Sequence, residues 1–482
     1  MTSSKRTRNQ NACDMCRSRR VKCRTVEGED ICEGCRFLGV GCTSNRPRRR
    51  RGPPNRHVAH GSPSDSVLPL SPISFQPSSA STPSTNILDL LGPGPLIQKV
   101  LSDWFTHIHP LAPVFHRRLF FSRLRSGDAN NDPTFCGLVI SVICATCATL
   151  RRKSFTEYHP ITLERCICTI RRQDLLPADG PYTADWCIAK YNLATASMAQ
   201  RGLSDPWTHR MFGEAVMGTR YLLNYKTDLD LVDVEALKRL YCLLEISAIN
   251  VAMLGQPIFG HLTNERSGFP INPHPYTDAD LEGSPFLAQT VDTDIQPSPS
   301  DRTTYVPGLT RLRSLFQTWH KCQIDRFYLP ASQVLASGLR AIQTTIDTLP
   351  PELRWRGGLS RPANATSGHD VQIASVFITS LYIRSNLLQQ FGESSDAGNK
   401  EEHQRIVSDL LEVLCHLPQE TLEANGYSLI PKIRDIGGAY LEVVKVDTDG
   451  GLVDIGIEAK EKLERLLRQL GVLDFRPTLD AP

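Results

Sequence analysis

Six cysteines lie close together near the beginning of the sequence, and their spacing is regular. They repeat the pattern C-x2-C-x6-C twice, with 8 residues between the copies, at Cys13, Cys16, Cys23, Cys32, Cys35 and Cys42. Thiolates are ligands that select zinc, and a structural zinc ion takes four ligands in a tetrahedron. The first residues lack the apolar segment of an export signal, so we expect a reducing compartment, in which clustered cysteines bind metal rather than form disulfides.

The spacing alone leaves two interpretations of this cluster open. Two separate four-ligand sites need eight ligands, and the first histidine is His57, so two zinc ions fit only if two cysteines each bridge both metals. Alternatively, a one-zinc ribbon uses only the two C-x2-C pairs and leaves Cys23 and Cys42 as free thiols. The repeat favours the two-zinc cluster, because the ribbon gives no reason for the third cysteine of each copy. The six-residue spacers predict two short helices around the cluster.

Positive charge is concentrated beside the cysteines. Residues 1–60 contain 15 Lys and Arg against 5 Asp and Glu, whereas the remaining residues contain 39 against 46. A basic module joined to a mildly acidic body indicates a polyanion-binding domain. The spacer of the second copy has one basic residue, whereas that of the first has four, which predicts that the first copy faces the polyanion through Arg17, Arg19, Arg20 and Lys22.

The cysteine pattern and the segment ACDMCRSRRVKC at 12–23 resemble the fungal zinc binuclear cluster (Zn2Cys6) DNA-binding domain, over residues 10–52. The resemblance implies two zinc ions per chain, double-stranded DNA as a partner and a nuclear location. In this family the first and fourth cysteines bridge the metals. One zinc ion would then be held by Cys13, Cys16, Cys23 and Cys32, and the other by Cys13, Cys32, Cys35 and Cys42. The proline that members usually carry before the fourth cysteine is absent from the loop 25–31.

The same resemblance implies that the first helix of the module enters the major groove at a CGG triplet. Arg20 stands at the position of the family's main base-contacting residue, and an arginine can pair bidentately with guanine O6 and N7. Arg17, Arg19 and Lys22 are expected to contact phosphates or assist, which makes the affinity salt-dependent. The alternative is that these four residues are only a solvated surface on a zinc-folded module.

Basic runs flank the cluster on both sides. The run before it, at 5–8, and the run after it are each predicted to be a nuclear localisation signal or a phosphate-contacting arm, with a disordered basic tail as the alternative. No heptad pattern of three or more heptads follows Gly52, so dimerisation stays open. The second run also resembles the basic Arg-Gly-Pro segment of maltose and starch activators and contains Arg48, Arg49, Arg50 and Arg51.

The remaining sequence predicts a linker and a helical body. From Gly61 to Thr85, 16 of 25 residues are Ser, Thr or Pro, so we expect a flexible linker at 61–86 between a DNA-binding domain at 1–60 and a regulatory domain at 87–482. Residues 256–307 contain eight prolines and are predicted to form an irregular insertion. Apolar residues recur with helical spacing, which predicts an all-α body with helices within 97–105, 184–201, 207–225, 230–254, 309–347, 370–391, 403–416 and 457–470.

This body resembles the middle-homology region of fungal transcription factors. The resemblance is carried by the segments 104–117, 239–241 with 255–257, and 432–436. Residues 372–388 and 423–426 are also similar to regulators of the starch-activator type and of secondary-metabolite gene clusters. The resemblance implies an activator of RNA polymerase II genes that contacts the transcription machinery, with a small-molecule effector as a further candidate partner. We expect control of a secondary-metabolite cluster, with maltose or starch utilisation genes as the alternative.

The competing hypothesis is a helical enzyme or scaffold that uses the zinc module for protein contacts. The sequence contains neither a nucleophile elbow nor a phosphate-binding loop, so no catalytic residue and no enzymatic activity are predicted. The longest nearly apolar stretch, 135–150, is shorter than the ~20 residues of a membrane span, so no membrane partner is expected. Several metal-ligand types elsewhere are expected to be structural: Cys144, Cys147, Cys166, Cys168, His107, His109 and His116.

Overall fold

The computed structural model divides the chain into two compact units, residues 1–81 and 82–482. The described residues are 6–8, 13–14, 16, 23–26, 31–37, 41–44, 86–256, 271–282, 302–355, 362, 365–393, 397–445 and 457–474. The predicted linker, apart from Asn86, and the arginines at 48–51 lie outside this set. Asn86 caps the first short helix of the second unit by accepting a hydrogen bond from the N–H of Leu88.

The first unit contains a two-stranded antiparallel sheet and a short helix. β1 (Arg6–Arg8) pairs with β2 (Arg24–Val26) in a register that places Thr7 opposite Thr25. α2 (Glu33–Phe37) starts directly after Cys32 and is the second of the two short helices that the spacers predict. The first predicted helix falls mostly on residues that are not described, although Asp14 and Cys16 have helical backbone. The sheet was not predicted.

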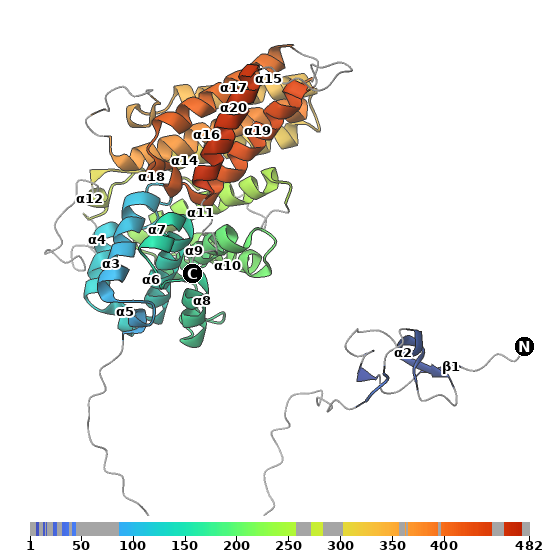
Figure 1. Cartoon of the computed structure of the whole chain (residues 1–482). Coiled ribbons are helices and arrows are strands. Elements are labelled where there is room, and N and C mark those ends of the chain that lie inside the picture. Colours follow the sequence, from blue (N-terminus) through green and yellow to red (C-terminus); the bar gives the residue numbers. More distant parts are fainter. Residues whose placement is uncertain are drawn as a thin grey trace, which may run out of the picture. The chain divides into compact units, whose positions relative to one another are not determined.

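All the secondary structure among the described residues of the second unit is helical, as the body pattern predicts (Figure 1). Its first half contains η1 (Ile87–Leu90), α3 (Gly94–Asp103), the π-helix η2 (Trp104–Ile108), α4 (Arg117–Arg125), α5 (Asp128–Asn131), α6 (Pro133–Thr149), α7 (Arg151–Thr156), α8 (Leu163–Arg172), α9 (Ala184–Arg201), α10 (Pro206–Tyr225) and α11 (Leu231–Met253). Its second half contains α12 (Asp278–Leu281), α14 (Val306–Asp325), α15 (Ala331–Asp347), η4 (Pro351–Leu353), α16 (Ser367–Phe391), α17 (Ala397–His416), α18 (Gln419–Ala424), η5 (Gly426–Ser428), α19 (Leu429–Lys445) and α20 (Ile457–Leu473).

Polar caps set the starts of four helices in the first half. Asp132 accepts hydrogen bonds from two backbone N–H groups at the start of α6, and Pro133 occupies its first position. Thr183, Asp205 and Asp230 cap α9, α10 and α11 in the same way. Each cap satisfies N–H groups that have no partner inside the helix. The cap at Thr183 explains why α9 begins at Ala184, where the apolar spacing predicts it.

Two hydrophobic cores hold the second unit together, and two helices contribute to both. The first core is built around α6, which packs along α9, and the second around α16, which packs against α14, α15, α17 and α19. α11 places Leu237 and Leu240 in the first core but Ile249 and Met253 in the second, and α14 begins in the first core with Leu309. In Figure 1 the blue to green helices and the yellow to red helices accordingly form two adjoining groups.

The predicted helical stretch at 309–347 contains two helices rather than one. α14 ends at Asp325, and α15 starts at Ala331 with Pro330 as its N-cap residue. Pro330 has no backbone N–H to donate, and it disfavours helical geometry in the residue before it. The chain therefore turns between the two helices, which pack against each other and against α16.

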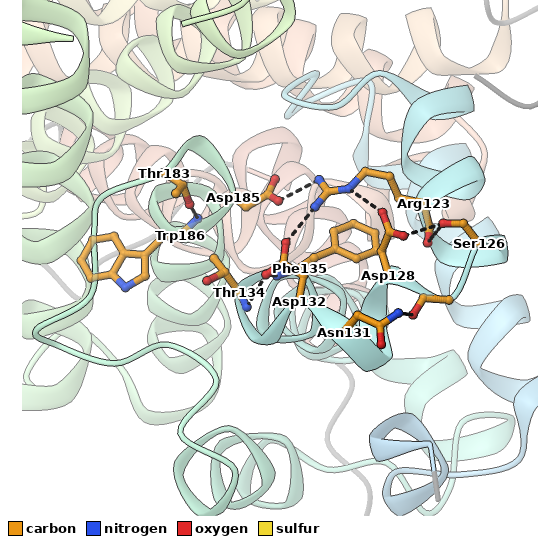
Figure 2. A network of polar contacts seen from close by, with 11 residues as sticks. Arg123, Ser126, Asp128, Asn131, Asp132, Thr134, Phe135, Thr183, Asp185 and Trp186 are labelled. Atoms are coloured by element: carbon orange, nitrogen blue, oxygen red, sulfur yellow. Dashed lines mark hydrogen bonds and ion pairs between the residues drawn. The ribbon is translucent and has the colours of Figure 1, made fainter. Parts of the chain in front are cut away.

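A single arginine joins four elements of the first half (Figure 2). Arg123 on α4 forms ion pairs with Asp128 of α5 at 3.5 Å, with the α6 cap Asp132 at 3.2 Å and with Asp185 of α9 at 2.8 Å. Its guanidinium also lies 3.9 Å from the ring centroid of Phe135. Because this side chain is only 27% exposed, these contacts fix the position of α4 against the first core.

Part of the predicted insertion is attached to the helical body. Arg239 donates a hydrogen bond to the carbonyl of Tyr276 at 3.2 Å, and Arg313 donates to that of Ile271 at 2.8 Å. The buried carboxylate of Asp278 accepts a hydrogen bond from the N–H of Arg117 at 2.8 Å. Residues 271–282 therefore follow the body surface and end in α12, whereas 257–270 and 283–301 lie outside the described residues.

One described helix, α16, is long and apolar enough to cross a membrane by length and composition. However, 83% of its apolar window is buried inside the second unit. It also buries polar side chains that bond within the fold, such as Gln372, whose amide nitrogen donates to the carbonyls of Pro110 and Tyr305. This burial is typical of the central helix of a folded core.

Candidate metal centre and nucleic-acid interface

Four cysteine sulfurs in the first unit form a compact buried group. The Sγ atoms of Cys13, Cys16, Cys32 and Cys35 all lie within 4.8 Å of one another. Cys13 Sγ is 3.7 Å from Cys32 Sγ and 3.6 Å from Cys35 Sγ, and Cys16 Sγ is 3.5 Å from Cys32 Sγ. A disulfide would require about 2.05 Å, so these are unbonded thiols placed around common points.

These distances fit zinc. With Zn–S bonds of about 2.3 Å, tetrahedral ligands lie about 3.8 Å apart, which is close to the three separations above. The other two cysteines join the same cluster: Cys23 is buried and interacts with Cys16, and the half-buried Cys42 interacts with Cys35. A one-zinc ribbon leaves Cys23 and Cys42 without a role, whereas a two-zinc cluster uses both.

The two halves of the repeat position their sulfurs with the same local turn. The N–H of Cys16 donates to Cys13 Sγ at 3.4 Å, and the N–H of Cys35 donates to Cys32 Sγ at 3.4 Å. Asp14 then connects the start of the first half to the end of the second. Its N–H donates to the carbonyl of Thr43 at 2.8 Å, and its carboxylate accepts from the Thr43 hydroxyl at 3.1 Å.

The same turns favour the thiolate form at the two equivalent positions. Burial opposes ionisation of Cys32, but the N–H of Cys35 and the neighbouring thiols outweigh it and lower the pKa of Cys32 to about 6. The pKa of Cys13 is also lowered against burial, because the N–H of Cys16 hydrogen-bonds to its sulfur. Burial and the neighbouring sulfurs raise the pKa of Cys16, and they raise that of Cys35 to about 12. The local turns therefore favour the thiolate form at Cys13 and Cys32.

The residues predicted to contact DNA lie outside the described residues, namely Arg17, Arg19, Arg20, Lys22, Arg48, Arg49, Arg50 and Arg51. In the second half the described part of the spacer carries the exposed Arg36. Sequence reasoning missed that the basic run at 5–8 includes strand β1, which pairs with the strand that follows Cys23. The β-branched residues Thr7, Thr25 and Val26 were the available signal.

The other residues of metal-ligand type were expected to be structural, and Cys168 departs from this expectation, because its thiol is exposed. Cys144, Cys147 and Cys166 are buried, and the described residues hold no metal-ligand group beyond that of the first unit. His109 Nε2 contacts the carbonyl of Phe115 at 3.1 Å. His116 caps α4, with Nδ1 accepting a hydrogen bond from a backbone N–H and Nε2 contacting the carbonyl of Asp278. These contacts use the ring nitrogens that a metal would need.

Comparison with known proteins agrees with the geometry of the first unit. Residues 11–51 match the family model of the fungal Zn(2)-Cys(6) binuclear cluster domain. The chain is 37% identical over 67 residues to the glucose transport transcription regulator of Kluyveromyces lactis, and 45% identical over 53 residues to the maltose fermentation regulatory protein of Saccharomyces cerevisiae. These matches cover 13% and 11% of this chain and 7% and 11% of the two relatives. No solved structure matches the chain.

Proposed function

We propose that this chain, which carries a fungal Zn2Cys6 binuclear cluster domain at residues 11–51, is a nuclear, sequence-specific DNA-binding transcription regulator. The observation that supports this most strongly is the buried cysteine cluster beside a basic segment. The cluster supplies a rigid support, and the basic residues supply phosphate and base contacts. The matched segments span only 7% and 11% of the relatives' lengths. The function of the whole chain is therefore our proposal.

The cofactor is zinc, with two ions in the domain. We assign Cys13 and Cys32 as the bridging ligands, because their sulfurs lie next to each other. Each also contacts a cysteine sulfur of the other half and accepts a hydrogen bond from a backbone N–H of its own half. Cys16 and Cys23 complete one site, and Cys35 and Cys42 complete the other. Six thiolates and two Zn²⁺ ions sum to a charge of about −2, which the surrounding basic residues must outweigh for DNA to bind. When bound, the metal supplies structural stability.

In this proposal the first half of the module reads DNA. Arg20 pairs bidentately with a guanine of a CGG triplet, while Arg17, Arg19 and Lys22 contact phosphates or assist. The basic run that includes Arg48 to Arg51 acts as a phosphate-contacting arm or as a nuclear localisation signal, for which its four consecutive arginines provide the charge.

Two gene sets are candidates for regulation. The similarity of the helical unit to regulators of secondary-metabolite clusters supports activation of a biosynthetic cluster transcribed by RNA polymerase II. The names of the two relatives, which refer to glucose transport and maltose fermentation, favour carbohydrate utilisation as the second candidate. Both relatives match over short segments only, so their names bear on the DNA-binding mode more than on the target genes.

The test is fluorescence anisotropy of the zinc-loaded full chain on a CGG duplex and on a scrambled duplex. We expect the wild type to prefer CGG, and Arg20→Ala to cost about 1–3 kcal/mol on CGG and far less on the scramble. Arg36→Ala is the matched control, because this exposed arginine lies in the equivalent spacer of the second half. It should leave the preference unchanged.

Equal binding of both duplexes by the wild type would overturn sequence-specific recognition. The dependence of affinity on salt tests the competing hypothesis of a scaffold that uses the zinc module for protein contacts. DNA binding through phosphate contacts weakens steeply as salt rises, whereas protein docking need not. Full-chain samples without measurable DNA affinity at low salt would favour the scaffold.

A further inference from the structure

A cavity of about 780 Å³ lies in the second unit between elements of its first half and elements of its second half. Its walls come from α7 and the end of α9 on one side, and from η5, α19 and the residue after α20 on the other. In Figure 1 these are green-blue helices of the first group and red helices of the second. The volume lies in the range of about 300–1,000 Å³ that is typical of small-molecule sites.

The charged residues of this cavity are predominantly basic. Three arginines line it, Arg151, Arg201 and Arg434, and Asp474 is the one carboxylate among its lining residues. Arg201 also pairs outside the cavity with Glu164 at 3.5 Å, but that carboxylate is 65% exposed and its attraction is weakened by solvent. The cavity therefore has an excess of positive charge.

The position of Asp474 indicates where an anion binds. Its two carboxylate oxygens are 3.9 Å from Arg151 and 3.9 Å from Arg434. Both separations are longer than a hydrogen bond, and they place one carboxylate between the two guanidinium groups. A bound anion could approach either arginine to about 2.8 Å, the distance of a charge-assisted hydrogen bond.

The remainder of the lining is apolar and aromatic. Ile161 and Ile430 are buried lining residues, while Phe155 is 56% exposed at the cavity. Tyr427 lies 5.8 Å from the guanidinium of Arg151 and presents a further aromatic surface. A ligand that complements this lining has an apolar body in addition to its charge.

We propose that this cavity binds a small organic anion, with a carboxylate or phosphate group attached to an apolar body. The anionic group lies between Arg151 and Arg434 and displaces Asp474, and the apolar body contacts Phe155, Tyr427 and Ile430. The assignment is independent of the DNA-binding proposal, because all its residues belong to the second unit. Since the walls come from helices of both cores, a bound ligand connects the two halves of this unit.

Calorimetric titration of the zinc-loaded full chain tests the proposal with three probes that share one apolar body. These are 2-naphthoate, 2-naphthyl phosphate and the neutral 2-naphthylmethanol. We expect at least one anion to bind about tenfold more tightly than the neutral probe. This is the difference in affinity expected for one charge-assisted contact. The tighter of the two anions identifies the preferred head group.

Two variants locate the binding in this cavity. Arg434→Gln should weaken binding of the anion about threefold, because it removes one solvent-screened guanidinium from the site. The variant should fold normally, since this side chain is 63% exposed. Asp474→Asn should increase the affinity for the anion, because it removes the competing carboxylate. Arg340→Gln is the control, an exposed arginine on α15 outside the cavity, and should change nothing.

If the cavity binds the anion, Arg434→Gln and Asp474→Asn change the affinity in opposite directions. If these residues form only a structural ion pair, both variants weaken that pair. Thermal unfolding of each variant shows whether it is folded. The proposal is overturned if neither anion binds at millimolar concentration, if the neutral probe binds equally well, or if folded Arg434→Gln retains wild-type affinity.

Discussion

Cys13 and Cys32 hold the same position in the two copies of the cysteine repeat, and their sulfur atoms lie 3.7 Å apart. Each sulfur accepts a hydrogen bond from the N–H three residues later. A small unit with a two-stranded sheet and one short described helix has little apolar core. Metal binding is therefore the main source of its folding free energy in our proposal.

The bridging assignment predicts that Cys13→Ser and Cys42→Ser differ in zinc content. Loss of Cys13 removes a ligand from both sites and should abolish binding of both ions, whereas loss of Cys42 removes a ligand from one site and should leave about one ion per chain. Metal analysis after dialysis measures the stoichiometry. Cys168→Ser is the control, because that thiol is exposed and lies in the second unit. Equal zinc contents for the first two variants would contradict the assignment.

A buried lysine makes the stability of the second unit depend on pH. Lys432 is enclosed in the second core, where burial lowers its pKa to about 7, and its Nζ donates to Thr379 Oγ1 at 2.8 Å. Between pH 7 and about 10, the unfolded chain binds a proton at this lysine that the folded chain lacks. Stability should therefore rise with pH over this window, by up to about 1.4 kcal/mol per pH unit.

Lys432→Met removes the titrating group and should flatten this rise. Urea unfolding of wild type and variant at neutral pH and at about pH 9 measures the difference in slope. Lys460→Met is the control, since Lys460 is exposed on α20. Parallel pH profiles for wild type and Lys432→Met would show that the amine does not titrate in this range.

Asp233 should make the stability of the second unit depend on pH in the opposite direction, at lower pH. Burial raises its pKa to about 7, and the carboxylates of Asp230 and Asp185 add to the effect, while Arg123 opposes it. Between about pH 4 and 7 the folded chain binds a proton that the unfolded chain lacks, so this residue's contribution to stability falls as pH rises.

Asp233→Asn should therefore stabilise the chain above pH 7 and have little effect near pH 4. Thermal unfolding at both ends of this range measures the change in Tm. Asp179→Asn, at an exposed position, is the matched control. A stabilisation that is the same at both pH values would contradict the shifted pKa.

The sequence predicts best where local chemistry decides the structure. The cysteine spacing predicts the metal cluster, and capping residues such as Thr183 predict where helices begin. α6 was missing from the predicted helices, because it is apolar on nearly every face and shows no helical period. Pro330 carried the signal for the break between α14 and α15.

Long-range contacts were beyond sequence reasoning. The hydrogen bonds of Arg239 and Arg313 to residues 271–276 join segments that are 37 and 42 positions apart, and no local pattern specifies them. The pairing of β1 with β2 likewise depends on how the cluster closes. The cavity at Arg151 and Arg434 combines residues 283 positions apart in the sequence, so its charge cannot be inferred from either segment alone.

Helix α11 has a consequence for how the second unit can be divided experimentally. Most of its buried apolar residues belong to the first core, whereas Ile249 and Met253 near its end belong to the second. A truncation that ends after α10, or one that begins after α11, removes buried apolar residues of α11 from the core that remains. Such fragments should aggregate on expression. The two helical groups are thus one cooperative piece, and recombinant boundaries belong before η1 and after α20.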